Sequence, residues 1–404
     1  MMSADFKEGA GMRKKRMARC GLVTLAAAGI LLGLGSARAE VPQAQTPLRF
    51  SADKPQLLVT AEYMTVDELT EPSLMALLRK YDILVAPCIR DYQLETEDGQ
   101  KELDRLFTIY EGAGIPIVFW PLTPRKDGLY LNKLASKTFY DYIDRIYAWA
   151  DQYQHPILAM ILDIEPLNFQ SGDYRSPDQP ESEGLGLGPV IKAMDPKCFK
   201  QAKRDFIKIQ EKLHAHGTIA ISTALDYAAM DIVMHVSAWE DMSGGPTMGI
   251  DWDYVSFMNF GSNNQKFFSG LLKSWKLEDT RYLSYKLGKA IYRKYGNKGA
   301  ISTGQTLPGE GHGAIYTDPA ELATDISVLR AAGIMHFAIY DLQGIAQSEN
   351  PEAWLQAARE AQTQPIKPAF RFKAWMIYQV FKKLTLILEV ARLSVHHPCS
   401  EPIP

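Results

Sequence analysis

The sequence contains few of the residues that build metal sites. It has 4 cysteines and 8 histidines among 404 residues, and it carries neither a C-x-x-C pair nor the H-E-x-x-H pattern of zinc hydrolases. We therefore expect no metal centre. Three cysteines, Cys88, Cys198 and Cys399, lie beyond the N-terminal segment. Their number is odd and their spacing favours no particular disulfide pair.

Several loop motifs are missing as well. The chain has no G-x-x-x-x-G-K-[ST] phosphate loop and no G-x-S-x-G nucleophile elbow. The turn after the first expected strand, residues 62–67, has no glycine, which argues against a dinucleotide-binding fold. The formal net charge of -3 lacks the basic excess of nucleic-acid-binding proteins. The sequence thus predicts no cofactor, no serine esterase and no nucleic-acid partner.

The N-terminus resembles an export signal. Residues 13–19 are basic, residues 20–35 are apolar, and Ala37-Arg38-Ala39 has the A-x-A form of a cleavage site. We expect residues 1–39 to be a signal peptide, so that the mature chain begins at Glu40 and is secreted or periplasmic. Met12 is an alternative start, since residues 3–11 add nothing to the signal.

Strand-like and helix-like segments alternate through the rest of the chain. Eight strand-then-helix units are the number in a (β/α)8 barrel, a TIM barrel of the α/β class. We expect one such domain over residues 40–360, and an open doubly wound sheet is the alternative. The expected strands are 56–63, 82–90, 115–120, 157–164, 218–226, 254–260, 299–305 and 335–341. Two long loops follow the fourth and seventh strands. A loop of the length of 168–195 is usually a functional lid or disordered, and the glycines of 306–313 indicate a mobile or tightly turned segment.

One stretch dominates the search for chemistry. Residues 157–162 form an apolar run, and Asp163, Glu165 and Pro166 follow closely. Such a run indicates a strand buried on both faces. Residues i and i+2 of a strand share a face, so the two carboxylates should point the same way. Buried paired acids have pKa values that separate, as glycoside hydrolysis requires, although a structural ion pair is the alternative.

The other candidate residues come from the ends of the remaining strands. Barrel enzymes carry their active sites at the carboxyl ends of the strands. Two further acids there are candidate catalytic groups, Asp226 and Asp341, although each could instead cap the following helix. The mixture of acids, amides and aromatics suits a carbohydrate cleft. The expected substrate-binding residues are Glu62, Tyr63, Arg90, Trp120, Tyr227, Met258, Asn259, Gln305 and Tyr340.

The C-terminal segment, residues 361–404, is expected to be a linker followed by an apolar and basic helix over 370–395. Lys382 and Lys383 interrupt its apolar run, so it is too broken to span a membrane. We favour a helix that packs on the barrel. The alternative is a helix that lies on a membrane surface and makes weak contact with it.

Three of these segments resemble glycoside hydrolase family 18, the chitinase-like barrels. They are the fourth strand with Asp163 and Glu165, residues 254–260, and residues 333–341. The family pattern in strand four is D-x-x-D-x-D-x-E, in which the final Glu is the general acid and the Asp two before it orients the substrate acetamido group. The resemblance implies these roles for Glu165 and Asp163. The strand-six pattern M-x-Y-D is similar to residues 258–261.

The chain departs from that family at several positions. Leu158 and Ile161 replace the two outer aspartates of the strand-four pattern, and Phe260 and Gly261 replace the strand-six Tyr and Asp. The Asp-x-Glu pair alone also resembles family 25 lysozymes. The expected function is therefore an exported glycoside hydrolase that cleaves a polysaccharide or amino-sugar glycan. The alternative is a glycan-binding protein that has kept a glycosidase-like barrel without catalysis.

Overall fold

A computed structural model gives the structure of the chain and describes residues 54–122, 130–165, 194–306, 316–395, 399 and 402–403. All described residues belong to one compact unit. The expected signal peptide and most of the two long loops lie outside the described residues.

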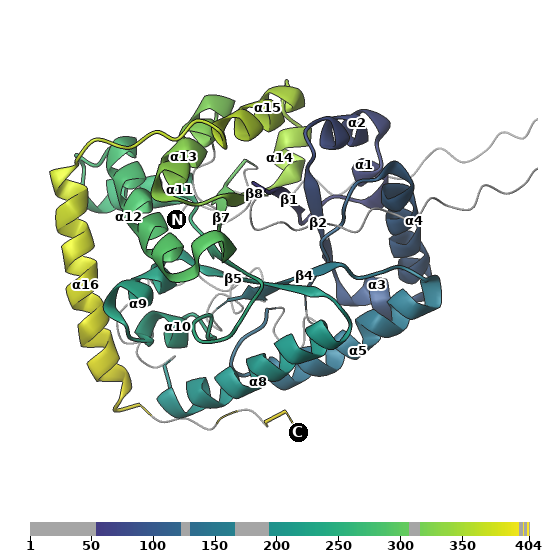
Figure 1. Cartoon of the computed structure of the whole chain (residues 1–404), viewed down its shortest axis with the longest axis horizontal. Coiled ribbons are helices and arrows are strands. Elements are labelled where there is room, and N and C mark those ends of the chain that lie inside the picture. Colours follow the sequence, from purple (N-terminus) through teal and green to yellow (C-terminus); the bar gives the residue numbers. More distant parts are fainter. Residues whose placement is uncertain are drawn as a thin grey trace, which may run out of the picture. The chain divides into compact units, whose positions relative to one another are not determined.

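Eight parallel strands form the centre of the molecule (Figure 1). Their order is β3-β2-β1-β8-β7-β6-β5-β4. Phe119 closes the ring between β3 and β4, because its N–H donates to Ala159 O at 2.9 Å and its carbonyl accepts from Ile161 N at 2.8 Å. The expected (β/α)8 barrel is confirmed. The strands are β1 Leu57–Ala61, β2 Leu84–Ile89, β3 Trp120–Pro121, β4 Ala159–Ile164, β5 Ile219–Leu225, β6 Tyr254–Met258, β7 Gly299–Gly304 and β8 His336–Tyr340.

Alternation along each strand separates two apolar layers. In β1, Leu57, Val59 and Ala61 face outward into the large core between strands and helices. Leu58 faces inward into a smaller cluster inside the barrel. Most strand residues are buried because helices cover the outer face, as is usual for parallel sheets.

Helices on the outside complete the barrel. Those between the strands are α1 Val66–Leu69, α2 Pro72–Lys80, α3 Asp91–Glu95, α4 Glu97–Ala113, α5 Ser136–Tyr153, α8 Pro196–Ala215, α9 Ala229–Met234, α10 Ala238–Met242, α11 Gly261–Leu271, α12 Leu277–Tyr295 and α13 Pro319–Ala332. After β8 come α14 Leu342–Ala346, α15 Pro351–Ala361 and α16 Phe372–Arg392. Local sequence sets several starts. The Asp195 and Asp318 side chains accept backbone N–H bonds at the starts of α8 and α13, each ahead of a proline at the first helical turn.

The segment between β6 and β7 agrees only in part with the sequence pattern. The pattern predicts one helix near residues 267–277 or extending later, but two helices, α11 and α12, flank a break at residues 272–276. The break is stabilised locally, because Lys276 N–H donates to Asp279 Oδ2 at 3.0 Å and Trp275 Nε1 donates to Thr280 Oγ1 at 2.8 Å. Capping by a residue inside the apolar pattern has overridden its periodicity.

The C-terminal helix α16 packs against α9, α10 and α12. Its inner side buries Ala374, Tyr378, Thr385 and Leu388, and Trp239 Nε1 of α10 donates to Thr385 Oγ1 at 2.7 Å. Among the described helices, none combines the length and the apolar character needed to cross a bilayer.

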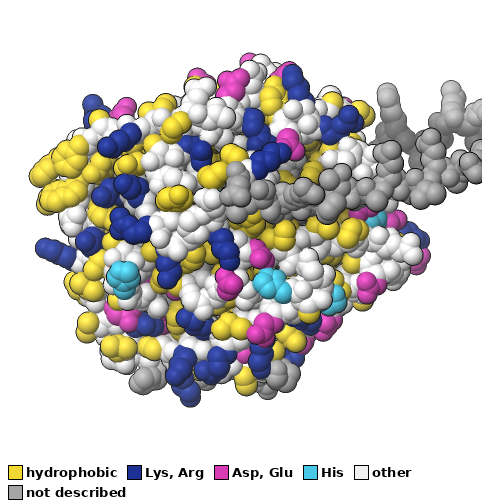
Figure 2. Space-filling model, in the orientation of Figure 1, with side chains coloured by type: hydrophobic (Ala, Val, Ile, Leu, Met, Phe, Trp, Pro, Cys, Tyr) yellow, Lys and Arg dark blue, Asp and Glu magenta, His cyan; other side chains and the backbone are white. Residues whose placement is uncertain are grey.

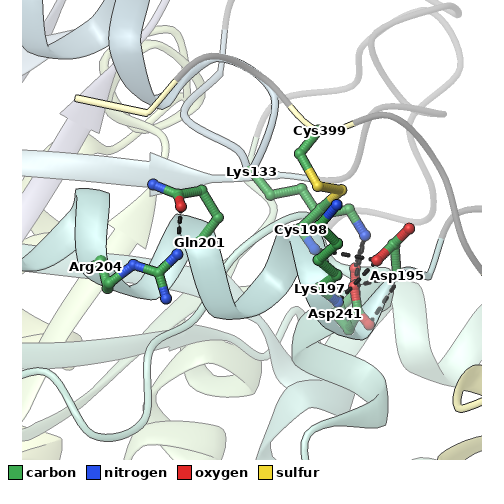
Figure 3. The surroundings of a disulfide bond; sticks show 8 residues. All are labelled: Lys133, Asp195, Lys197, Cys198, Gln201, Arg204, Asp241 and Cys399. Carbon is green, nitrogen blue, oxygen red and sulfur yellow. Dashed lines mark hydrogen bonds and ion pairs between the residues drawn. A yellow bond between two sulfur atoms is a disulfide. The ribbon is translucent and has the colours of Figure 1, made fainter. Parts of the chain in front are cut away.

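A buried ionic cluster and a disulfide hold the last residues to the barrel (Figure 3). The Asp241 carboxylate contacts Lys133 Nζ at 2.5 Å and Arg392 Nη1 of α16 at 3.2 Å. It also accepts the Asp195 N–H at 3.0 Å. Beside it, Cys198 of α8 is joined to Cys399 across 201 residues of sequence. Cys88 is a free thiol buried in β2.

We predict that removing the disulfide in a Cys198→Ser/Cys399→Ser variant lowers the melting temperature. A closed loop of this length restricts the unfolded chain and contributes up to about 5 kcal/mol in the chain-entropy account. Thermal unfolding is measured with and without reductant. Reductant should lower the wild-type melting temperature to that of the variant and leave the variant unchanged. A wild-type melting temperature that ignores full reduction would contradict the prediction.

Candidate functional site

A cavity of about 350 Å³ occupies the interior of the barrel, and its lining includes residues at the carboxyl ends of several strands. The room exists because inward-facing positions that are usually filled by branched apolar residues are small here. A volume of this size lies within the range of ligand pockets. The small lining residues are Thr60, Thr223, Ser256, Ala300, Ser302 and Ala338.

Asp163 and Glu165 both line this cavity, so the two side chains face the same way as the strand register predicted. Asp163 lies inside β4 and is only 6% exposed. Trp120 Nε1 donates to its Oδ2 at 3.2 Å, while Oδ1 is buried and has no hydrogen-bond partner among the described residues. Burial raises the pKa of Asp163 to about 7, with a further contribution from the Glu62 carboxylate. Near neutral pH this group can therefore donate or accept a hydrogen bond.

Glu165 is the first residue after β4 and is partly exposed. Its backbone N–H donates to Leu131 O at 3.3 Å. Gly244 packs against the other side of its peptide: a β-carbon on Gly244 would lie 2.7 Å from Glu165 O. Gly244 also has a φ of +94°, a conformation that favours glycine. The close approach fixes the backbone position of Glu165.

A third carboxylate in the cavity lining is that of Glu62, which follows the end of β1. Its Oε1 lies 3.4 Å from Arg90 Nη2, and its Oε2 accepts from Tyr340 Oη at 2.5 Å. Arg90 also lies over the Tyr63 ring, 5.9 Å from its centroid. Burial and the Glu62 charge raise the pKa values of the Tyr63 and Tyr340 phenols, so both remain proton donors. Four residues expected from three strand ends, those of β1, β2 and β8, thus form one cluster.

The other two candidate acids lie outside the cavity lining. Asp226 Oδ2 accepts from Asn259 Nδ2 at 2.9 Å and from Asn264 Nδ2 at 2.8 Å. Burial raises the pKa of Asp226. Asp341 is fully buried, and its Oδ1 accepts the Gly344 N–H at 3.1 Å at the start of α14. Burial raises the pKa of Asp341 to about 6. Asp341 thus caps the following helix, as the alternative expected, although its buried Oδ2 has no hydrogen-bond partner among the described residues. Asp226 is held by two asparagines and is not the N-cap of a helix.

Of the remaining expected residues, some line the cavity and others lie outside its lining. Met258 and Gln305 line the cavity. Asn259 is buried against Asp226. Tyr227 is packed beside Trp239, with 5.2 Å between the ring centroids, and neither Asn259 nor Tyr227 belongs to the lining.

Several larger residues that line the cavity were not among the expected site residues, and they include Tyr130, Phe260 and Asn263. Phe260 packs on Tyr340, with ring centroids 5.6 Å apart. The small inward residues were also not among the expected site residues, although their positions in the strands could have indicated them. Thr60, Thr223 and Ser256 stand two positions before a strand-end residue and so share its face.

Among the described residues, these acids do not belong to any group of three histidines, cysteines or carboxylates close enough to hold a metal ion. Within the described ranges, the one group of three neighbouring ligand types is Asp195, Cys198 and Cys399, and its two sulfurs are joined to each other.

Comparisons with known proteins place the chain in no family. No family model matches the sequence, and no curated protein matches it. Among solved structures, it is similar to the PgaB (BpsB) glycoside hydrolase domain from Bordetella bronchiseptica, at 12% identity over 76% of this chain and 99% of that one, with a TM-score of 0.45.

Other similar structures differ in activity. One is a GH18 chitinase from Pseudoalteromonas aurantia, at 8% identity over 76% of this chain and 99% of that one, with a TM-score of 0.43. Another is a D-psicose 3-epimerase with D-tagatose from Clostridium cellulolyticum H10, at 11% identity over 84% and 99%, with a TM-score of 0.36. Likeness at this level assigns no activity to the chain.

We predict that Asp163→Asn changes how stability depends on pH. The folded state holds the Asp163 proton up to about pH 7, against an ordinary pKa of 3.8. Ionisation of this group therefore costs stability as the pH rises from the lower value through the higher one. The variant lacks this loss, so its melting temperature should gain on that of wild type across this window. Asp151→Asn, at an exposed position, is the control, and identical pH profiles for all three proteins would disprove the effect.

We also predict that Gly244→Ala destabilises the fold near Glu165. The added methyl group meets a backbone oxygen that cannot swing away, and the backbone conformation alone costs roughly 1–2 kcal/mol for a residue with a side chain. Gly112→Ala is the matched control, because a β-carbon there meets nothing within 4 Å. In thermal unfolding, Gly244→Ala should melt several degrees lower than Gly112→Ala. Equal melting temperatures would show that the contact is not tight.

Proposed function

We propose that this protein is an exported glycoside hydrolase that acts on a polysaccharide or amino-sugar glycan, with Glu165 as its general acid. The observation that carries the proposal is the pair formed by Asp163 and Glu165 in one cavity at the barrel mouth. Asp163 has an unpartnered carboxylate oxygen among the described residues and a pKa raised to about 7. A buried acid with unused hydrogen-bonding capacity suits a ligand-binding role better than a stabilising one.

In this proposal Glu165 protonates the leaving glycosidic oxygen. Its place in the cavity lining and the close approach of Gly244 to its backbone support the role. Asp163 lies deeper and serves the sugar itself. If the substrate carries an N-acetyl group, ionised Asp163 accepts the amide N–H and holds the acetamido group for attack on the anomeric carbon.

A substrate without an N-acetyl group needs a second carboxylate. The distance between that group and Glu165 would then decide between retention and inversion. Asp226 and Asp341 were the expected candidates, but they lie outside the cavity lining. Glu62 belongs to it, and Arg90 and Tyr340 hold its carboxylate in place. Glu62 is therefore our candidate for the nucleophile or base in that case.

The cavity walls suit a carbohydrate. Trp120, Tyr130 and Phe260 provide aromatic surface for the apolar faces of sugar rings, and Glu62, Asp163 and Gln305 provide hydrogen-bonding groups for hydroxyls. A few polar groups on largely apolar walls fix the orientation of a small ligand.

One observation favours the second candidate, a glycan-binding protein without catalytic activity. Phe260 lines the cavity where the resemblance to family 18 leads one to expect a tyrosine, and a phenyl ring cannot steady a reacting carbonyl. Tyr340 lies against this ring but donates its hydroxyl to Glu62. In this case Asp163 and Glu165 would bind sugar hydroxyls only.

We predict that Glu165→Gln lowers kcat on chito-oligosaccharides or peptidoglycan fragments by at least about 100-fold, the smaller end of the contribution of a general acid. Glycan affinity should change little, because the amide keeps the shape and polarity of the side chain. Glu102→Gln, at an exposed position on α4, is the matched control. Product release is followed by chromatography and affinity by calorimetry.

Unchanged turnover in Glu165→Gln would remove Glu165 as the acid. A wild-type protein that binds a glycan, loses that binding in Asp163→Ala, and releases no product over long incubation would favour the binding protein instead.

A further inference from the structure

The C-terminal helix α16 is apolar on both of its sides. Its inner side packs on the barrel through residues such as Tyr378 and Leu388. Its outer side carries Phe372, Met376 and Val380 toward its start, and Ile387 and Val390 toward its end, all of them exposed. Ile387 is 64% exposed and Val390 70% exposed. Large aliphatic side chains gathered on one outward face mark an interaction surface.

Basic residues lie next to α16, on the side where its buried residue Tyr378 packs. A cavity of about 310 Å³ between α9, α12 and α16 is lined by Lys286, Lys289, Arg293 and Lys294 of α12, together with His235 and Tyr378. Burial and the neighbouring charges of Lys289, Arg293 and Lys382 lower the pKa of Lys286. In the part of the chain that the structure describes, none of these lysines and arginines forms an ion pair with a carboxylate.

Cations crowded without counter-charges attract anions. Figure 2 shows hydrophobic side chains at the left edge of the molecule, where Figure 1 draws α16, with Lys and Arg side chains beside them. The grouping is local, because the whole chain has a formal net charge of -3.

We propose that α16 docks the protein onto a membrane surface that contains anionic phospholipid. The outer apolar side chains enter the boundary between headgroups and acyl chains, as in other interfacial helices, and the α12 cations with Lys382 and Lys383 contact the phosphates. The helix has 21 residues and is therefore about 30 Å long. It lies along the surface and does not cross it.

The positive charge near α16 favours an anionic lipid surface over a second copy of the chain as the binding partner. A two-fold dimer through the outer face of α16 would bring the same basic groups of both copies together, and like charges across an interface are costly. An anionic lipid surface offers the opposite charge to the cations and an apolar layer to the side chains of α16.

The anchoring of α16 makes the surface rigid. Arg371 pairs with Asp279 of α12 at 2.8 Å, and Arg392 pairs with Asp241 of α10 at 3.2 Å. The helix is thus tied to the barrel near both ends, and membrane binding does not require its inner side to detach.

Vesicle flotation tests the proposal with the full chain. Phosphatidylcholine vesicles with phosphatidylglycerol should carry the protein, vesicles of phosphatidylcholine alone should carry little, and added salt should weaken binding. Two variants separate the contributions: Ile387→Ser/Val390→Ser removes apolar contact, and Lys289→Gln/Arg293→Gln removes charge. Each cation near an anionic surface is worth roughly fivefold in partitioning, so the charge variant should bind at least tenfold more weakly. The apolar variant should lose binding to a similar extent.

Matched controls lie away from α16. Leu134→Ser changes an exposed leucine elsewhere, and Lys101→Gln/Arg105→Gln removes two cations of α4; both should bind like wild type. Three results would overturn the proposal. They are no wild-type binding to anionic vesicles, binding that both α16-side variants retain, and a wild-type dimer that Ile387→Ser/Val390→Ser converts to a monomer. All variants should keep the wild-type melting temperature, which excludes loss of binding through unfolding.

Discussion

The pairing of β3 with β4 is the interaction on which the rest of the barrel depends, because it turns an eight-stranded sheet into a closed ring. Phe119 makes it through two backbone hydrogen bonds, to Ala159 O and from Ile161 N. Closure removes both sheet edges. It also sets the next residue, Trp120, against the β4 carboxylate, to which its indole donates at 3.2 Å. The same short contact therefore stabilises the fold and positions Trp120, the one hydrogen-bond partner of the Asp163 carboxylate among the described residues.

The interior of the barrel is less closely packed at the cavity than a typical protein core. Small inward side chains such as Thr223 and Ser256 leave the barrel interior partly empty, and a close-packed interior would have been more stable. The buried Asp163 adds a second cost, since its ionisation is opposed by burial and by Glu62. The large core between strands and helices supplies the stability that these features consume. Concentrated costs of this kind are typical of functional sites.

The sequence was sufficient to predict the barrel, because buried strands and capped helices have recognisable local sequence patterns. It also placed Asp163 and Glu165 on one face, since strand geometry has a period of two. The sequence could not show that the Glu62 carboxylate, from β1, helps to raise the pKa of Asp163. The distance between β1 and β4 side chains depends on how the barrel closes. The sequence could not show the support from Gly244 or the Cys198–Cys399 pair either, since each joins segments far apart in the chain. The break before α12 was not predicted, because side-chain capping there outweighs the apolar pattern of the sequence.

A continuous set of contacts connects the outer helix to the site. Thr385 of α16 accepts from Trp239 of α10, and Arg392 pairs with Asp241 of the same short helix. Gly244, which fixes the Glu165 peptide, follows α10 by two residues. Its carbonyl accepts the N–H of Lys133, whose ammonium group meets Asp241. Packed interiors transmit displacement because they have little room to absorb it. The segment that we assign to a membrane surface is therefore part of the support that positions the proposed general acid.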